Sequence, residues 1–383
     1  MNALYSKQSM KRYCKRVNIQ DYDFLKKCAK ECLKKKWNRR DVTSLFQNLT
    51  GKTKEEIKGL IKDDKDSLID IAAQYMQSSL INHELNFIPI WYKEKIDASN
   101  GKLRRIGIQH VSQQLFDYVA VNGMQDMLKR IGEYQCASIP GRGPVWGMKH
   151  IRKWLREKDV KYFAQLDVKK CFPSIPQKKL LTFLDKYIAN KEIRWLVHEL
   201  VRTFEEGLSI GSYLSQYLCN LYISILYHQI AENMYYVRRG KRINFVKHQL
   251  IYMDDINLFG SNAKTLHKAV SRIISIANDM GLTIKAKWSV QKLTGFIDTM
   301  GFRIYKNHVT IRRRVFLRIR RAYSHARKHI SLAYAYKCVS YAGQLLNTDS
   351  FKLICKWKMY KVLKQSKEMI RNESSLQLGT ARG

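Results

Sequence analysis

The sequence predicts an α+β fold, in which a β-sheet is backed by helices and both ends of the chain are helical. The apolar runs 249–251 and 256–259 flank a pair of acids and predict a β-hairpin with these acids at its tip. The run 162–168 predicts another strand that carries an acid near its end. Apolar residues at helical spacing in residues 1–82 and after residue 310 predict the terminal helices.

Between these parts the chain alternates between strand and helix patterns. Residues 87–92 and 103–108 predict two strands joined by a turn, which makes a hairpin that carries cations. Amphipathic patterns predict helices at about 109–128, 146–156, 180–187, 193–204 and 263–280. A Gly-marked turn at 207–216 leads into an apolar helix that runs to about residue 227. From residue 310 to about 367 the pattern is helical and intensely basic.

The composition is that of a globular chain whose partner is a polyanion. With 383 residues, 45% hydrophobic and 11% aromatic, the chain can bury a sizeable core. Its 70 Lys and Arg outnumber 32 Asp and Glu, giving a net charge of +38. Nucleic acid would neutralise such a surplus. An anionic membrane would also attract it, but we find no apolar run of about 18 residues and no signal peptide, so we expect no membrane partner.

The eight cysteines are scattered along the chain, and none forms a C-x-x-C pair. Cys28 and Cys32 have no matching second pair that would complete a zinc site. We therefore expect reduced thiols in a cytosolic protein.

Asp167, Asp254 and Asp255 are candidate metal ligands. Adjacent carboxylates such as Asp254 and Asp255 repel each other, and a bound dication with hard oxygen ligands would cancel that repulsion. A solvated Asp-Asp turn is the alternative for this pair taken alone. Asp167 lies far upstream, but two strands of one sheet could bring it beside Asp254. Three such carboxylates could hold two divalent ions roughly 3.5–4 Å apart for an in-line phosphoryl displacement.

The order of three motifs resembles that of reverse transcriptases. Asp167 is followed five residues later by Phe172, then Gly211 precedes Ser215-Gln216 at the start of a helix, and Tyr252-Met253-Asp254-Asp255 follows. Each motif alone is weak, but their ordered occurrence is specific. The resemblance covers roughly residues 87–365. It implies a right-hand polymerase fold with fingers, a palm with an antiparallel sheet and a helical thumb.

This resemblance also implies a division of the chain. A helical basic N-terminal extension would occupy residues 1–86, fingers and palm 87–304, a helical basic thumb 305–371, and a flexible tail 372–383. The first 40 residues are either an RNA-binding arm or a merely solvated basic helix face.

The resemblance assigns roles to individual residues. Asp167, Asp254 and Asp255 would be catalytic and, with Val168, would bind two Mg²⁺ ions, for which Mn²⁺ is an alternative. The nucleotide-binding residues would be Lys102, Arg104, Phe172, Ile210, Gly211, Gln216, Lys285 and Lys287. The primer and template contacts would be Tyr252, Met253, Met300, Gly301, Phe302, Arg312, Arg313 and Arg314. Whether Lys285 or Lys287 faces the pyrophosphate is left open.

Three of these assignments rest on side-chain chemistry. The Phe172 ring under the sugar would leave no room for a 2′-OH, although a core Phe is the alternative. Lys102 and Arg104 would hold the triphosphate, because cations bind phosphate and the planar guanidinium of Arg binds it bidentately. The alternative is a plain basic hairpin.

Ile210 stands where the family often has a Gln that touches the nucleotide. An aliphatic residue before Gly211 resembles reverse transcriptases of diversity-generating retroelements, which copy a template RNA with errors at adenines. Discrimination against a wrong base amounts to a few kcal/mol, so lost alignment would change fidelity. The predicted fingers and the loop 141–143 also look like those of group II-intron-like and defence-associated bacterial enzymes.

The implied activity is RNA-directed DNA synthesis in the cytoplasm of a bacterial host cell. Its partners would be template RNA, a DNA primer and dNTPs, with a structured non-coding RNA and a small basic accessory protein as further partners. The alternatives are an antiphage-defence reverse transcriptase, an RNA-dependent RNA polymerase, an untemplated terminal transferase and a catalytically inert RNA-binding assembly protein. Phe172 argues against ribonucleotides, and the three acids argue against an inert protein.

Overall fold

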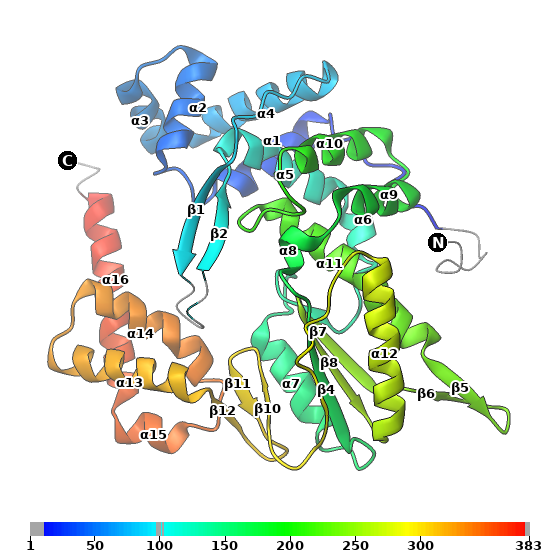
Figure 1. Ribbon diagram of the computed structural model, residues 1–383. Coiled ribbons are helices and arrows are strands. Elements are labelled where there is room, and N and C mark those ends of the chain that lie inside the picture. The colour runs from blue at the N-terminus through cyan, green and yellow to red at the C-terminus, as the bar shows by residue number, and fades with distance from the viewer. Residues whose placement is uncertain (1–10, 97–100, 102, 380–383) are drawn as a thin grey trace. The chain divides into compact units, whose positions relative to one another are not determined.

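The computed structural model describes residues 11–96, 101 and 103–379 (Figure 1). The chain divides into two compact units, each assembled from segments that are separate in sequence. The first unit comprises Met1–Gln135, Leu166–Asn233 and Val270–Lys287, and the second comprises Cys136–Gln165, Met234–Ala269 and Trp288–Gly383. Helices and antiparallel strands occur together, which confirms the predicted α+β class.

Four helices open the first unit, as predicted for the N-terminal part of the chain. They are α1 (Tyr22–Leu33), α2 (Arg40–Thr50), α3 (Lys54–Asp63) and α4 (Lys65–Ile81). Three of them begin at a side chain that accepts a backbone N–H of the first turn, namely Asp21, Thr53 and Asp64. Their apolar faces are buried, so packing holds the four helices together.

The next elements of the first unit are a hairpin and two helices. They are β1 (Trp91–Ile96), β2 (Leu103–Ile108), α5 (Val111–Gly123) and α6 (Gln125–Leu128). The first strand begins four residues later than predicted, since Pro89 lacks the N–H that strand pairing needs. The predicted helix over 109–128 is interrupted at Met124, whose φ is −89° and ψ is 8°.

The remaining elements of the first unit are mostly helical. They are α8 (Cys171–Ser174), α9 (Gln177–Tyr187), α10 (Lys191–Arg202), α11 (Tyr213–His228) and a π-helical turn, Gln229–Asn233. The predicted helices at 180–187 and 193–204, and the apolar helix predicted to end at about residue 227, are confirmed within a few residues. Helix α11 is apolar on most sides, which makes it the buried centre of this unit.

A five-stranded sheet forms the centre of the second unit. Its strands are β3 (Gln135–Cys136), β4 (Tyr162–Asp167), β7 (His248–Tyr252), β8 (Asp255–Gly260) and β9 (Val290–Lys292), in the order β3-β7-β8-β4-β9. Helix α7 (Pro144–Trp154) follows β3, and α12 (Ala263–Asp279) follows β8. The predicted hairpin is confirmed, because β7 and β8 pair antiparallel from His248–Phe259 to Tyr252–Asp255.

Two smaller sheets and four helices complete the second unit. The sheets are formed by β10 (Ile297–Thr299), β11 (Phe302–Ile304) and β12 (Val309–Ile311), and by β5 (Tyr235–Arg238) with β6 (Lys241–Asn244). The helices are α13 (Arg313–Lys328), α14 (Leu332–Leu345), α15 (Phe351–Lys356) and α16 (Met359–Gly379). Helix α16 continues past residue 372, where the sequence predicts a tail, since no Pro or Gly occurs before Gly379.

Within the described part of the chain, every helix is too short or too polar to cross a membrane.

Candidate active site

The acidic pair lies at a tight turn between two buried strands. Tyr252 and Asp255 form the last pair of the β7–β8 hairpin, so Met253 and Asp254 are its two-residue loop. The φ of Met253 is +54°, the left-handed conformation that such short loops require. Met is disfavoured in this conformation relative to Gly or Asn, so the turn stores backbone strain at the acids. Asp254 and Asp255 are both half-buried.

Tyr252 lies close to both carboxylates of this turn. Burial raises the pKa of its phenol, and the negative charges of Asp255 and Asp254 add to the effect, so the hydroxyl is neutral at ordinary pH. Its neighbour Ile251 accepts a hydrogen bond on its carbonyl from the thiol of Cys136, at 3.5 Å. That contact ties β7 to β3, directly behind the acidic turn.

Asp167 is the last residue of β4, the strand next to β8 in the sheet. The Lys161 N–H donates to the Gly260 carbonyl at 3.0 Å, so the start of β4 meets the end of β8 and the strands run antiparallel. Further along, the Gln165 amide donates to Asn257 Oδ1 at 3.0 Å. Asp167 follows Gln165 by two residues and is the last residue of β4.

A second chain segment runs along the residues that follow β4. Lys285 N–H donates to the Asp167 carbonyl at 2.9 Å, and the Lys169 N–H donates to Thr283 at 2.8 Å. The Lys285 ammonium also forms an ion pair with the Asp167 carboxylate. Lys287 is exposed. Of the two lysines that the sequence leaves open, Lys285 is thus the one placed against a predicted catalytic acid.

The chemistry of these donors suits a hard divalent ion. Asp167, Asp254 and Asp255 offer carboxylate oxygens, and the fully buried Val168 has a backbone carbonyl as its donor. Among the residues that the structure describes, no three His, Cys, Asp or Glu side chains are gathered closely enough to hold a metal ion. In this arrangement the Lys285 ammonium neutralises Asp167.

In the first unit, β2 meets the turn that precedes α11. The Gly107 N–H donates to the carbonyl of Ile210 at 2.7 Å. A Cβ at Gly211, whose φ is +114°, would overlap the Gly107 carbonyl, and a Cβ at Gly107 would overlap the hydroxyl of Ser209. The close approach of the two backbones thus requires glycine at 211, and a side chain at 107 would displace the Ser209 hydroxyl.

The same loop contacts the backbone of Phe172. The Leu208 N–H donates to the Phe172 carbonyl at 2.9 Å, and a Cβ at Gly207 would lie 2.6 Å from that oxygen. Phe172 itself is half-buried. Phe172 is therefore not a fully buried core residue, and part of its side chain is accessible.

Cations of β2 lie next to this loop. Arg105 forms an ion pair with Glu205 at 2.7 Å and covers the ring of Tyr92 at 4.1 Å. Successive strand residues point to opposite faces, so the exposed Arg104 lies on the other face from Arg105. Lys102 lies outside the described residues.

A buried carboxylate fixes the start of α11. Asp117, on α5, is fully buried and accepts hydrogen bonds from the Ser212 hydroxyl at 2.9 Å and the Leu214 N–H at 3.4 Å. Ser212 in turn caps the helix, because its Oγ accepts the Ser215 N–H at 3.2 Å. Burial raises the Asp117 pKa to about 6, although these hydrogen bonds oppose the rise.

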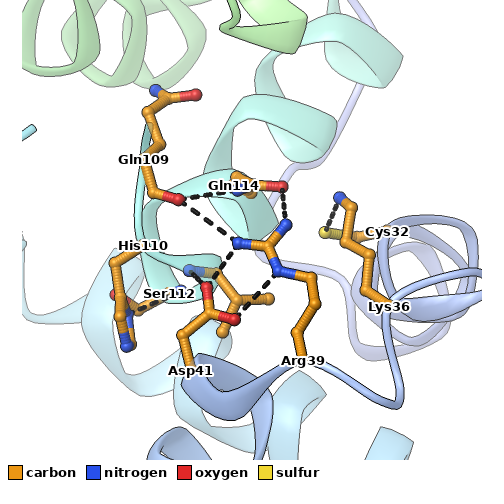
Figure 2. A network of polar contacts seen from close by, with 9 residues as sticks. Cys32, Lys36, Arg39, Asp41, Gln109, His110, Ser112 and Gln114 are labelled. Atoms are coloured by element: carbon orange, nitrogen blue, oxygen red, sulfur yellow. Dashed lines mark hydrogen bonds and ion pairs between the residues drawn. The ribbon is translucent and has the colours of Figure 1, made fainter. Parts of the chain in front are cut away.

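A polar network joins the N-terminal helices to the segment between β2 and α5 (Figure 2). Arg39 forms an ion pair with Asp41 at 2.5 Å and donates to Gln114 Oε1 at 3.3 Å. Asp41 accepts the Val111 N–H at 3.0 Å, and Gln114 donates to the Gln109 carbonyl at 2.7 Å. The network thereby holds the exit of β2 and the first turn of α5 against α2.

The predicted primer hairpin is present, but two of its side chains face the core. Met300 and Gly301, with φ of +52° and +87°, form the turn between β10 and β11. Phe302 is fully buried, and Met300, 8% exposed, packs where a Cβ of Gly147 would lie. Both side chains are thus packed inside the protein, and their predicted contact with a primer stays a prediction.

The three predicted arginines after β12 lie in different settings. Arg312 forms an ion pair with the carboxylate of Asp298. The backbone carbonyl of Asp298 accepts a hydrogen bond from the side-chain amide of Gln165, on β4, at 3.3 Å. Arg313 and Arg314, in the first turn of α13, are exposed. Gln216 and Ile210 are half-buried.

Residues 93–308 match the family described as Reverse transcriptase (RNA-dependent DNA polymerase). The match covers more than half of the chain, which therefore belongs to this family. The protein is thus an RNA-directed DNA polymerase, a nucleotidyltransferase. Enzymes of this class act on an RNA template, a primer and dNTPs, and generally use divalent metal ions. No curated protein matches the sequence.

The contacts of two residues, Asp117 and Arg105, were not predicted from the sequence, although Arg105 belongs to the basic cluster predicted for the hairpin. Asp117 is the single acid within the apolar run 115–121, a pattern that could have indicated a buried carboxylate. Arg105 gave no such signal, because its neighbours Lys102 and Arg104 are equally basic.

Asp117 should make stability depend on pH. Its pKa rises from about 3.9 in an unfolded chain to about 6 in the fold, so its contribution to stability is complete below about pH 4 and is lost as the pH rises through 6. In Asp117→Asn the amide can still accept both hydrogen bonds, and this loss should disappear. In urea unfolding between pH 4 and pH 7, the free energy of unfolding of the variant should increase relative to that of the wild type by up to about 3 kcal/mol.

The matched control is Asp63→Asn, at an exposed carboxylate on α3, which should keep the wild-type pH profile. Parallel profiles for the wild type and Asp117→Asn would contradict a raised pKa at Asp117.

Proposed function

We propose that this protein copies an RNA template into DNA with Asp167, Asp254 and Asp255 as its catalytic acids, and that it does so with low fidelity, in the manner of diversity-generating retroelements. The observation that carries the first part is the sheet order. Asp167 ends β4, and Asp255 begins its antiparallel neighbour β8. Strand ends at one edge of a sheet are a common place for catalytic side chains to converge.

The roles of the chain's own residues follow from their contacts. Two Mg²⁺ ions, when bound by Asp167, Asp254, Asp255 and the Val168 carbonyl, would activate the primer 3′-OH and stabilise the leaving pyrophosphate. Lys285 would supply a proton or positive charge to the pyrophosphate, because its ammonium already lies against Asp167. Tyr252 would support the primer end with a neutral phenol.

The nucleotide would be positioned by elements of the first unit. Arg104 and Lys102 would hold its phosphates. The accessible face of Phe172 would lie under the sugar, since the backbone of this residue is held by Leu208. Ile210 and Gly211 would contact the base pair without offering a side-chain hydrogen bond.

We assign residues 87–304 to fingers and palm and residues 305–371 to a thumb that contacts duplex phosphates. The exposed cations Arg313, Arg314 and Arg320 on α13 support this assignment.

The activity is tested by extending an annealed DNA primer on a defined RNA template with Mg²⁺ and four dNTPs. The wild type should produce templated cDNA, and Asp254→Asn should lower the yield by orders of magnitude, because an amide is a poor ligand for Mg²⁺. RNA binding, measured on the same preparations, should stay nearly intact. Equal loss of synthesis and binding would mean that Asp254 has a structural role.

Phe172→Ala should admit ribonucleotides, because it removes the ring that would collide with a 2′-OH. Single-nucleotide extension should show dNTP over rNTP selectivity falling by roughly 10–200-fold, the range for a steric contact of this size. Phe172→Tyr keeps the ring and should keep the selectivity. The steric role is disproved by unchanged selectivity in Phe172→Ala.

Ile210→Gln should reduce misincorporation opposite template adenine severalfold, since it supplies a hydrogen-bonding side chain next to Gly211. The substitution spares the Ile210 carbonyl, which accepts the Gly107 N–H. Ile210→Val is the matched control that stays aliphatic. Sequenced cDNA from the three proteins gives the error spectrum, and an identical spectrum would remove the link between Ile210 and fidelity.

A further inference from the structure

The β5–β6 hairpin, residues 235–244, is an exposed basic ribbon that the proposed copying reaction does not use. Every residue in it is exposed apart from the half-buried Ile243. In Figure 1 it stands out beside the strands of the five-stranded sheet. Only its base is fixed, where Met234 and Phe245 are buried and the Phe245 N–H donates to the Met234 carbonyl at 2.8 Å.

The ribbon carries four cations, Arg238, Arg239, Lys241 and Arg242, and no acid. Over the described ranges, Arg238, Arg239 and Lys241 form no ion pair with any carboxylate. By contrast, Lys247, three residues after the ribbon, is neutralised by Glu157 at 3.0 Å and Asp159 at 2.9 Å. The charges of Arg238, Arg239 and Lys241 are therefore left for an external anion.

The first residue of the turn of the ribbon is not one that makes such a turn most stable. Arg238 pairs with Lys241, so Arg239 and Gly240 form a two-residue loop, with φ of +49° and +72°. Asn-Gly or Asp-Gly is the usual choice where both central residues have positive φ. An Arg in the first position costs conformational energy, and it places a third cation beside Arg238 and Lys241 at the tip.

Aromatic rings accompany these cations. The cross-strand pairs place Tyr235, Val237 and Arg242 on one face, where the guanidinium of Arg242 lies 4.0 Å from the centre of the Tyr235 ring. Tyr236 lies on the other face, with its ring 6.0 Å from that of Phe245. Tyr235 and Tyr236 are each 38% exposed, so part of each ring is open to a stacking partner.

We propose that the β5–β6 hairpin binds single-stranded nucleic acid at a surface separate from the copying site. Phosphates would contact Arg238, Arg239 and Lys241, and an unpaired base would stack on Tyr235. Strands of four residues are about 13 Å long, enough for two or three nucleotides. A duplex would keep its bases stacked on one another, so exposed rings favour a single strand. A hairpin that entered a membrane would carry apolar residues at its tip, whereas this tip is Arg-Arg-Gly-Lys.

The test uses the full-length protein and an unstructured 15-nucleotide RNA or DNA of the same sequence, labelled for fluorescence anisotropy. Excess unlabelled template–primer duplex occupies the copying site. The variant is the triple substitution Arg238→Gln, Arg239→Asn and Lys241→Gln, in which Asn suits the turn. Its affinity for the single strand should fall at least tenfold at low salt. The slope of log affinity against log salt should fall by about 2, because three phosphate contacts are lost.

Three controls separate this surface from general charge and from misfolding. The triple substitution Lys52→Gln, Lys58→Gln and Lys62→Gln changes the net charge equally at exposed residues of and next to α3, and should leave binding unchanged. Tyr235→Ala should weaken binding roughly tenfold, whereas Tyr235→Phe should keep it. Extension of a short pre-annealed primer should be equal in wild type and hairpin variants.

An affinity and salt slope equal to those of the wild type in the hairpin variant would overturn the proposal. Equal losses in the α3 control would overturn it too, since they would reflect net charge alone. If the hairpin variant lost binding to vesicles that contain phosphatidylserine but bound the oligonucleotides like the wild type, the proposal would be overturned and the hairpin would be a membrane contact instead. A loss confined to RNA or to DNA would support the proposal and identify the strand. Failure of primer extension by the wild type would count against the copying function alone, because the binding assay does not depend on it.

Discussion

The close backbone approach of β2 to the turn before α11 is the contact on which the rest of the first unit's candidate site depends. One hydrogen bond, from Gly107 to Ile210, joins two segments that are about a hundred residues apart, and a Cβ at Gly211 would collide with the Gly107 carbonyl. The Arg39–Asp41 network holds the residue that follows β2, and Asp117 holds the first turn of α11. The strand that carries Arg104 and the helix that Ser212 caps are therefore fixed to each other by backbone and buried polar contacts.

Several acids of this very basic chain form ion pairs with cations near the strands. Glu157 and Asp159 neutralise Lys247, Asp298 neutralises Arg312, and Asp167 is held by Lys285. These pairs lie next to strands of the sheet, whereas α13 and the β5–β6 hairpin present cations outward. Such a distribution lets a chain with a net charge of +38 fold without strong internal repulsion, while it keeps cations available for nucleic acid.

Local patterns predicted most of the elements and the position of the acids. The β7–β8 hairpin could be predicted because two apolar runs lie close together in the chain, and the turn between them must then contain Asp254. The β5–β6 hairpin was not predicted, since its strands are exposed on both faces and an isolated ribbon has no buried face to impose alternation. The tail was not predicted to be helical, because polar residues without an apolar face are equally compatible with coil.

By itself the sequence determined the class of fold, the family and the residues at the two strand ends, because hydrophobic periodicity and motif order are properties of neighbouring residues. Only the tertiary structure decided which lysine lies against Asp167, why Gly107 is needed, and that Met300 and Phe302 face the core. These facts depend on contacts between residues far apart in the chain. Long-range partners are selected by packing and by the satisfaction of buried polar groups across the whole fold, and no local window of sequence contains that information.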